Sequence, residues 1–393
     1  MYRDEGYTMI RKLKKIDPVI MFILGCFIFF STLVIYSAAT GGNFGNLHIN
    51  NIILYAASFI PFIVVAFTDY RIIIHSFSYL FYTIGIGLLL LVQVMGQSIN
   101  GSKRWIGIGS FQFQPSELMK ILLILVLAHV LSRREGQPLR FIKDIIPLGV
   151  LAIIPFYQIF KQPDLGTALV LVSICLGMIW IGNLKVAHLA LGAALLTVII
   201  SGIILLHSSN PELLSKFVKP HQMDRIQTFL DPSSNPDKSW HVRNSIIAIG
   251  TGELYGKGYL QGSYVQGGFV PYDYSDSIFV VIGEEFGFVG SSILLMLYMI
   301  FIYRMIQIAI QCKDLSGTYL IVGIISMFTF QIFENIAMHI GILPLTGISL
   351  PFISYGGSSL FTNMIAMGLV MSVRIHHDQP LLWEGFRLRR LLG

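Results

Sequence analysis

Long runs of apolar residues constrain this chain more than any other feature of its sequence. Each run has about 20 residues, which is the length a helix needs to cross the hydrocarbon core of a bilayer. Over 393 residues, 54% are hydrophobic and only 12% are charged, whereas a soluble domain carries roughly 25% charged residues. Too few polar side chains are available to cover a water-soluble globule. The sequence therefore predicts an all-α polytopic membrane protein.

Ten such runs can be distinguished, and short loops join most of them. Because lipid offers the backbone no hydrogen-bond partners, we expect each run to be a helix. The one long connection, 207–275, falls between the seventh and eighth runs. It contains helix-like stretches, so we expect a large structured extracellular loop there. The whole of 1–393 is then a single membrane domain. The predicted spans are 18–38, 51–68, 76–95, 115–132, 144–160, 165–182, 186–206, 276–310, 317–340 and 358–375.

Basic residues beside the spans set the predicted orientation. Lys and Arg gather in the loops that a ten-span topology places on one side, which is expected to be the cytoplasm. The N-terminus (1–17) and the tail (376–393) are then cytoplasmic, and 207–275 lies outside with the connections 96–114 and 341–357. We attribute the formal net charge of +6 to orientation and not to nucleic-acid binding. The basic residues behind this prediction are Arg11, Lys12, Lys14, Lys15, Arg71, Arg133, Arg134, Arg140, Lys143, Lys185, Lys313, Arg387, Arg389 and Arg390.

One stretch places a carboxylate where lipid meets water. The segment 256–275 is rich in Gly and Tyr, and Asp276 follows it directly before an apolar run. At the outer mouth of a span, water thins out and a carboxylate becomes a stronger base. Asp276 is therefore the candidate catalytic residue, and Asp273 is a competing carboxylate. The aromatic side chains of the stretch offer flat faces suited to a membrane interface or to sugar rings.

A second unusual stretch precedes the fourth predicted span. Lys103 and Arg104 are cations in an external loop, against the positive-inside tendency, and a phosphate or a lipid headgroup would explain them. Trp105 can anchor the interface or stack on a sugar, and a β-turn loop with a Trp at the interface is an equally supported interpretation. Glu117 lies near a helix start and Lys120 follows three residues later, so a local ion pair is the preferred interpretation of these two charges.

Other polar groups lie in or beside the apolar runs. Asp164 precedes the sixth run and is expected to cap its helix. The Pro- and Gly-rich segment 341–359 is expected to form a wall of the same external cavity, with a plain loop as the alternative. Glu334 lies within the ninth run, where a carboxylate is costly enough to suggest a partner or a pathway. Of the adjacent Glu284 and Glu285, at most one is expected to face the cavity.

Six motifs follow one another along the chain. They are Gly101-Ser-Lys-Arg-Trp-Ile106 with Gln114-Pro-Ser-Glu117 and Lys120; Gln162-Pro-Asp-Leu-Gly-Thr167; Arg225-Ile-Gln-Thr-Phe-Leu-Asp-Pro232; Ile247-Ala-Ile-Gly250 with Gly256-Lys-Gly258; Ser275-Asp276 with Ile278-Phe279 and Ile282-Gly-Glu-Glu285; and Gly347-Ile-Ser-Leu-Pro-Phe-Ile-Ser-Tyr-Gly-Gly357. In this order the motifs resemble those of the SEDS family of bacterial shape, elongation, division and sporulation proteins, of the RodA and FtsW type. The resemblance covers all ten predicted spans.

This resemblance implies a fold, an activity and partners. It implies ten transmembrane helices and a peptidoglycan glycosyltransferase that polymerises lipid II on the outer face of the bacterial cytoplasmic membrane, in cell-wall synthesis for cell shape or cell division. The family's external-loop aspartate maps onto Asp276 and its external tryptophan onto Trp105. The implied partners are a class B penicillin-binding protein, which is a transpeptidase, and other membrane proteins of the elongation or division complex.

The implied reaction needs one base and positive charge. Asp276 would remove the proton from the acceptor's 4-hydroxyl, which attacks the anomeric carbon of a lipid-linked MurNAc and releases undecaprenyl diphosphate with inversion. Cations would stabilise the leaving diphosphate. A divalent cation, Mg²⁺ or Mn²⁺, could assist, and no other cofactor is expected. The candidate substrate-binding residues are Trp105, Lys103, Arg104, Glu117, Lys120, Arg225 and Lys257.

Two other functions are compatible with the same residues. A transporter that flips lipid II would also have an external cavity and polar residues in its spans. A noncatalytic scaffold of the wall-synthesis complex would tolerate the loss of Asp276. A base at the outer mouth, rather than a charged relay through the middle of the membrane, favours the enzyme.

Overall fold

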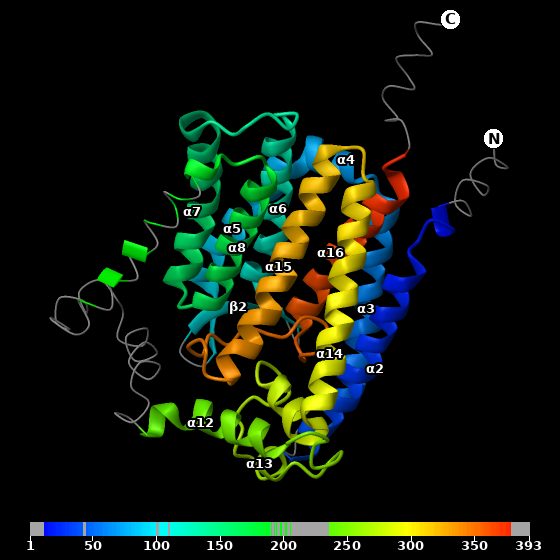
Figure 1. The fold of residues 1–393 in the computed structure, drawn as a ribbon, viewed down its shortest axis with the longest axis vertical. Coiled ribbons are helices and arrows are strands. Elements are labelled where there is room, and N and C mark those ends of the chain that lie inside the picture. The colour runs from blue at the N-terminus through cyan, green and yellow to red at the C-terminus, as the bar shows by residue number, and fades with distance from the viewer. Residues whose placement is uncertain are drawn as a thin grey trace, which may run out of the picture.

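Long helices run side by side through the molecule, and one of its ends carries short helices and a small sheet (Figure 1). The structure, a computed structural model, describes residues 12–41, 45–99, 102–108, 111–188, scattered residues between 190 and 205, and 236–378. Among these residues, eight helical segments are long and apolar enough to cross a membrane. They are α2 (Pro18–Gly41), α3 (Leu47–Phe67), α4 (Tyr70–Ile72) with η1 (Ile73–Phe77) and α5 (Ser78–Met95), α6 (Pro115–Ser132), η2 (Phe141–Ile145) with α7 (Ile146–Lys161), α14 (Ile278–Gln311), α15 (Leu315–His339) and α16 (Gly357–His376).

A ninth apolar helix, α8 (Leu165–Ile181), is shorter than these and packs against α15 and α7. With α8 included, the first six and the last three predicted spans each correspond to a helix of the structure. The seventh predicted span, 186–206, lies largely outside the described residues. The helical membrane fold is therefore confirmed, and the count of ten spans stays a prediction.

The most buried helices form the centre of the bundle. Most of α6 and α16 and more than half of α15 are buried, whereas well under half of α2, α3, α5 and α7 is buried, and each of these helices carries large exposed apolar side chains. Exposed apolar surface on this scale is unusual for a soluble protein. It is the expected outer surface of a bundle that faces lipid, so the chain is a multi-pass membrane protein.

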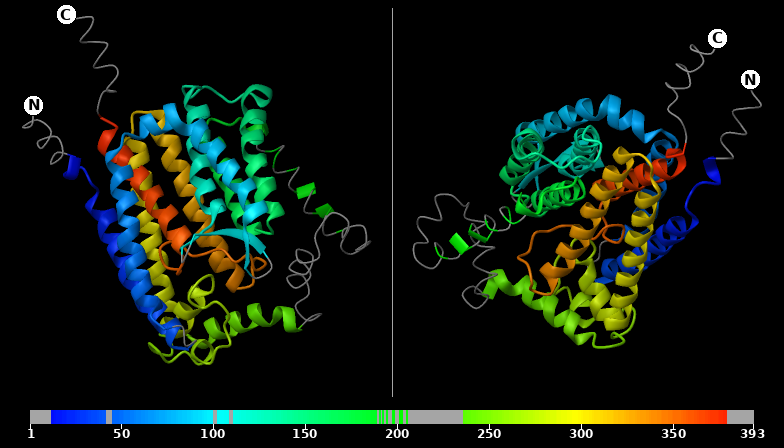
Figure 2. Two further views of the ribbon diagram at one scale, coloured as in Figure 1. Left: turned by 180° about the vertical axis from the view of Figure 1, so that it is seen from behind. Right: turned by 45° about the horizontal axis from the view of Figure 1, so that its top comes forward.

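The two ends of the bundle differ. One end holds the start of α2 and the end of α16, where Lys15 Nζ donates to the carbonyl oxygen of Ile375 at 3.4 Å; we call it the terminal end, and it is at the top of Figure 1. The opposite end, the loop end, carries α12 (Pro236–Thr251) and α13 (Ser263–Gln266). Two further views show the same separation (Figure 2).

A three-stranded antiparallel sheet lies at the loop end, where the sequence predicted only a loop. The strands β1 (Gln97–Ile99), β2 (Ser102–Ile108) and β3 (Phe111–Phe113) pair in the order β1-β2-β3. The predicted all-α fold did not include this small sheet. Three short strands interrupted by Gly give no clear alternation of polar and apolar residues, and packing of β2 on α5 and α6 and of β3 on α16 supports them instead.

Helix α14 is kinked near its start. The length of the eighth predicted span suggests an oblique or re-entrant start at Asp276 that straightens after Gly290, and the structure has a kink at Gly287 (φ 62°, ψ −157°). A Cβ at Gly287 would lie 2.4 Å from the backbone nitrogen of Gly256. Only glycine tolerates both this φ and this close approach. The kink therefore lets the segment around Gly256 pass directly over α14.

Candidate active site

A polar cavity of about 400 Å³ opens at the loop end of the bundle. Its walls come from the sheet and the start of α6, from the start of α8, from the turn before α14, and from the segment between α15 and α16. The segment 341–359 thus forms a wall of the cavity, as the sequence predicted. The lining residues are Arg104, Trp105, Gln112, Gln114, Glu117, Asp164, Thr167, Tyr272, Ser275, Asp276, Thr346, Gly347, Ile348, Ser349, Tyr355, Gly356, Ser358 and Ser359.

Asp276 lines this cavity in the turn that leads into α14, and it is only partly buried. Its Oδ1 accepts a hydrogen bond from Ser275 Oγ at 3.1 Å. A Cβ added to Gly347 on the facing wall would lie 3.5 Å from its Oδ2. The main chain is held from the opposite side, because its carbonyl oxygen accepts from Asn335 Nδ2 at 2.7 Å and from His339 Nε2 at 2.9 Å. A fixed backbone therefore presents this carboxylate to the cavity.

Arg104 on β2 lines the cavity and also holds one of its walls. Its Nε donates to the carbonyl oxygen of Gln162 at 3.0 Å, and Nη2 donates to that of Pro163. Its Nη1 lies 3.6 Å from Asp164 Oδ1. The guanidinium fork therefore orders the turn between α7 and α8 while its charge remains at the cavity.

Asp164 caps α8, as the sequence predicted. Its Oδ1 accepts from the backbone N–H of Thr167 at 3.2 Å. Its Oδ2 accepts from Gln114 Nε2 at 3.0 Å and from Ser116 Oγ at 3.3 Å. One carboxylate thus joins the start of α8 to the start of α6, and these two helix starts both line the cavity.

Glu117 and Lys120 form the predicted ion pair, with Oε2 and Nζ separated by 2.9 Å. Glu117 lines the cavity, whereas the Lys120 side chain is fully buried and is not part of the lining. A buried ammonium is stable only beside such a partner. Lys120 therefore acts on the cavity through Glu117 and not by direct contact.

The other predicted cations are not brought to the cavity. Lys103 is exposed and is absent from the lining. Lys257 lies elsewhere, with its Nζ 3.0 Å from Glu284 Oε1, because the Gly-rich loop folds back over α14 and meets that carboxylate first. Arg225 lies outside the described residues. Among the described residues, Arg104 is thus the one cation that lines this cavity.

The remaining acidic candidates lie behind or away from the cavity. Asp273 is buried and is not part of the lining, and burial raises its pKa to about 7. Glu284 accepts hydrogen bonds from backbone N–H groups at the start of α13, and Glu285 Oε1 accepts from Ser37 Oγ on α2. Glu334 is fully buried, and neither of its carboxylate oxygens has a hydrogen-bond partner among the described residues.

Three carboxylates and one guanidinium line the cavity, which raises the question of a metal. The described residues contain no group of three or more His, Cys, Asp or Glu side chains that could hold a metal ion. The carboxylates instead have protein partners: Glu117 pairs with Lys120, and Asp164 pairs with Arg104. We therefore derive no step through a divalent cation.

Several lining residues could not be found from the sequence. Gln112 and Ser358 are ordinary polar residues in the sequence, yet Ser358 Oγ donates to the carbonyl oxygen of Gln112 and accepts from the backbone N–H of Gln114, both at 3.0 Å. This contact joins β3 and α6 to the start of α16. The Pro and Gly content of 341–359 indicated the wall but not which side chains face inward.

The fold and the site define a class: a helical multi-pass membrane protein with a polar, carboxylate-bearing cavity at one end of its bundle. Residues 13–379 match the family of FtsW, RodA and SpoVE cell cycle proteins, and the chain belongs to this family. The resemblance to SEDS proteins is thereby confirmed.

Curated relatives and a solved structure agree with this membership. The chain is 36% identical over 287 residues to stage V sporulation protein E of Bacillus subtilis, covering 73% of this chain and 75% of that protein. It is 34% identical over 362 residues to the peptidoglycan glycosyltransferase MrdB of Escherichia coli, covering 92% and 94%. A chain from a peptidoglycan synthase complex, solved to describe the structural coordination of polymerization and crosslinking, superposes with a TM-score of 0.77 at 28% identity, covering 93% of this chain and 99% of that one.

Proposed function

We propose that the loop-end cavity is where this chain joins lipid-linked disaccharides into glycan strands, with Asp276 as the base. The chain is a peptidoglycan glycosyltransferase for cell-wall synthesis, as its family and its relatives indicate. The observation that carries the assignment of the site is the carboxylate of Asp276, which faces a polar cavity at the end of an apolar bundle.

In the proposed reaction, Asp276 accepts the proton of the 4-hydroxyl on the acceptor sugar of lipid II. The oxygen attacks the anomeric carbon of the donor, the bond to the diphosphate breaks, and undecaprenyl diphosphate leaves with both electrons of that bond. An α-linked donor gives a β-linked product, so a single inverting displacement with one base is sufficient. The neutral donor Ser275 positions the carboxylate of Asp276 without neutralising it.

Arg104 and Trp105 are the proposed contacts of the donor. Both line the cavity, on the neighbouring wall formed by β2. The Arg104 guanidinium provides positive charge where the diphosphate leaves, and the indole of Trp105 offers a face on which a sugar can stack. Glu117 and Lys120 would support this wall as a neutral pair.

We further propose that the single domain 1–393 has ten spans, with α8 as the sixth and 186–206 as the seventh. The terminal end would face the cytoplasm and the loop end, with 207–275, the outside. The contact between Lys15 and Ile375 supports this topology, because an even number of spans returns the chain to its starting side. Arg71, at the same end, fits a cytoplasmic location by the positive-inside tendency.

The proposed partner is a class B penicillin-binding protein that crosslinks the strands, together with other membrane proteins of the elongation or division complex. Support comes from the solved peptidoglycan synthase complex, whose description couples polymerization with crosslinking. A transpeptidase bound beside the cavity would receive each strand as it is extended.

The test is polymerisation of lipid II in detergent, with the transpeptidase of the partner blocked, followed by gel analysis of the glycan. Asp276→Asn keeps the size of the side chain and removes the base, so we expect polymer formation to fall about 10²- to 10⁴-fold. Asp273→Asn is the matched control and should polymerise normally. Near-normal polymer from folded Asp276→Asn would refute the assignment. No polymer from the wild-type chain would favour a flippase, which needs two compartments.

A further inference from the structure

The turn that carries Asp276 is held from behind by buried side chains of α15. Asn335 and His339 are both fully buried, and both donate to the main-chain carbonyl oxygen of Asp276. We propose that Asn335 and His339 are positioning residues, which fix the carboxylate of Asp276 in the cavity by fixing its main chain. The inference rests on the proposed role of Asp276 as the base.

Asn335 joins two walls of the cavity. Its Nδ2 donates to the carbonyl oxygens of Asp276 and Ile348, both at 2.7 Å. An amide nitrogen carries two hydrogens, and both are used here. Asp276 and Ile348 line the cavity from the turn before α14 and from the segment between α15 and α16. One amide group therefore sets the separation between these walls at the position of the carboxylate.

His339 adds a second donor to the same carbonyl. Its Nε2 lies 2.9 Å from the carbonyl oxygen of Asp276, which can only accept, so the hydrogen of the neutral ring is on Nε2. Its Nδ1 faces Ser245 Oγ on α12 at 3.4 Å. Because Ser245 Oγ donates its own hydrogen to the carbonyl oxygen of His241 at 2.9 Å, the hydrogen bond that this ring makes runs from Nε2 to the turn.

The residue after Asp276 is held in the same manner from α12. Ser277 Oγ donates to the carbonyl oxygen of Pro271 at 2.8 Å, so it accepts from His241 Nε2 at 3.0 Å. Burial lowers the pKa of His241 to about 4, which keeps this ring neutral beside that of His339, with ring centroids 5.9 Å apart. Donors from two helices therefore immobilise the turn on both sides of the carboxylate.

Immobilising the main chain has a direct consequence for the reaction. An aspartate has only two side-chain torsions, so its carboxylate can be aimed accurately once its backbone is fixed. A base must lie within hydrogen-bond distance of the proton that it removes, and a misplacement of about 1 Å can reduce the rate about 100-fold. Loss of these donors should therefore reduce kcat and leave substrate binding nearly unchanged.

The test compares donor-keeping and donor-deleting variants of the full chain in complex with its transpeptidase partner. Asn335→Asp keeps the size of the side chain but replaces the donor with an acceptor, and we expect kcat for lipid II polymerisation to fall about 100-fold with KM within about threefold of wild type. His339→Leu should reduce kcat about 10-fold. His339→Gln retains an N–H donor and should recover to within about threefold of wild type.

The result that would overturn the inference is an unchanged kcat in folded Asn335→Asp, or an equal kcat in His339→Gln and His339→Leu. If Asn335→Asp does not fold, the two His339 variants decide the question, because they are compared with each other. Asp276→Asn is measured beside them. Full activity of Asp276→Asn would refute the proposed base itself, whereas an inactive Asp276→Asn beside fully active Asn335→Asp and His339→Leu would refute only the positioning role.

Discussion

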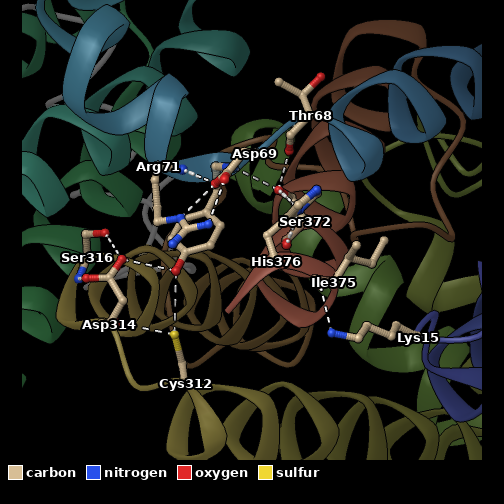
Figure 3. A network of polar contacts seen from close by, with 11 residues as sticks. Lys15, Thr68, Asp69, Arg71, Cys312, Asp314, Ser316, Ser372, Ile375 and His376 are labelled. Atoms are coloured by element: carbon tan, nitrogen blue, oxygen red, sulfur yellow. Dashed lines mark hydrogen bonds and ion pairs between the residues drawn. The ribbon is translucent and has the colours of Figure 1, made fainter. Parts of the chain in front are cut away.

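Both ends of this bundle bury polar groups, but they treat them differently. At the terminal end the acidic side chains accept hydrogen bonds from protein donors (Figure 3), whereas at the loop end the carboxylate of Asp276 lines a cavity. We call the terminal-end contacts the terminal network. Its members are Lys15, Thr68, Asp69, Tyr70, Arg71, Cys312, Asp314, Ser316, Ser372, Ile375 and His376.

Ion pairing and capping satisfy the acids of the terminal network. Asp69 caps α4 and accepts from Arg71 Nε at 3.0 Å and from Nη2 at 2.8 Å. Asp314 caps α15 and accepts from Tyr70 at 3.0 Å. Burial acts to raise the pKa of Asp69, but the hydrogen bonds and charge of Arg71 outweigh it and hold the pKa below its ordinary value. These contacts fix how α3, α4, α14, α15 and α16 pack.

The comparison teaches how to separate structural from functional polar groups in a membrane protein. Buried polar groups whose hydrogen bonds are all made within the protein contribute stability and specificity of packing. A carboxylate that is held by its main chain and lines a polar cavity, as Asp276 does, lies where a ligand can enter. The terminal network is therefore structural, and the loop-end cavity is where we propose that the chemistry takes place.

The largest expected effect is on stability, from Asp69→Ala. This change leaves the buried guanidinium of Arg71 without its carboxylate, so we expect the free energy of unfolding to fall by about 3–5 kcal/mol. Because the pKa of Asp69 is lowered on folding, the loss is fully present at neutral pH and shrinks in acid, where the wild-type carboxyl is protonated. Thermal unfolding in detergent measures the stability at each pH, and polymerisation per folded molecule measures the activity.

The matched variant is Asp276→Ala, which should unfold near the wild-type temperature and make no polymer. The comparison between the two ends fails if Asp69→Ala folds stably but cannot polymerise lipid II.

A second prediction concerns the pH dependence of stability near the cavity. Burial raises the pKa of Asp273 to about 7 in the folded protein, whereas its value in the unfolded chain is near 4. The folded protein thus binds this proton more tightly, so ionisation destabilises it as pH rises from about 4 to 7, by on the order of 4 kcal/mol. Asp273→Asn should lose this dependence and be the more stable chain at pH 8.

Thermal unfolding of both chains at pH 5 and pH 8 is the measurement. His241 contributes with the opposite sign, because burial lowers its pKa and its protonation destabilises the folded protein in acid. The difference between wild type and Asp273→Asn removes this common contribution. An equal pH dependence in the two chains would show that Asp273 ionises normally.

The smallest expected effect comes from Glu334→Met. Neither oxygen of this fully buried carboxyl has a hydrogen-bond partner among the described residues, so an apolar side chain of similar length should raise the free energy of unfolding by about 1–3 kcal/mol. Polymerisation should stay within about twofold of wild type. A complete loss of polymer from the stabilised variant would show that the reaction also depends on the carboxyl of Glu334, which lies on α15 outside the cavity.

The sequence was sufficient for the helical fold, and it indicated a candidate base whose role stays a prediction. Apolar runs identified nine described helices, and Asp276 was found because it directly precedes one of them in a motif shared with a known family. The charges that pair locally, Glu117 with Lys120, were also predictable, since three residues on a helix bring them together.

Contacts between distant segments were not predictable. Asn335 was visible only as a polar residue in a span, and its partner, the carbonyl oxygen of Asp276, lies 59 residues away. Lys257 was expected at the substrate, but the kink at Gly287 brings its loop over α14 and onto Glu284. Such pairings depend on how the chain folds back on itself, and no local pattern records them.

The most direct measurement of the central claim is a cryo-electron microscopy structure of the Asp276→Asn variant with lipid II and its transpeptidase partner. The account predicts a lipid-linked sugar in the loop-end cavity, with the 4-hydroxyl oxygen of the acceptor about 2.6–3.2 Å from the side chain of residue 276. A sugar bound elsewhere, with no hydroxyl near that side chain, would contradict it.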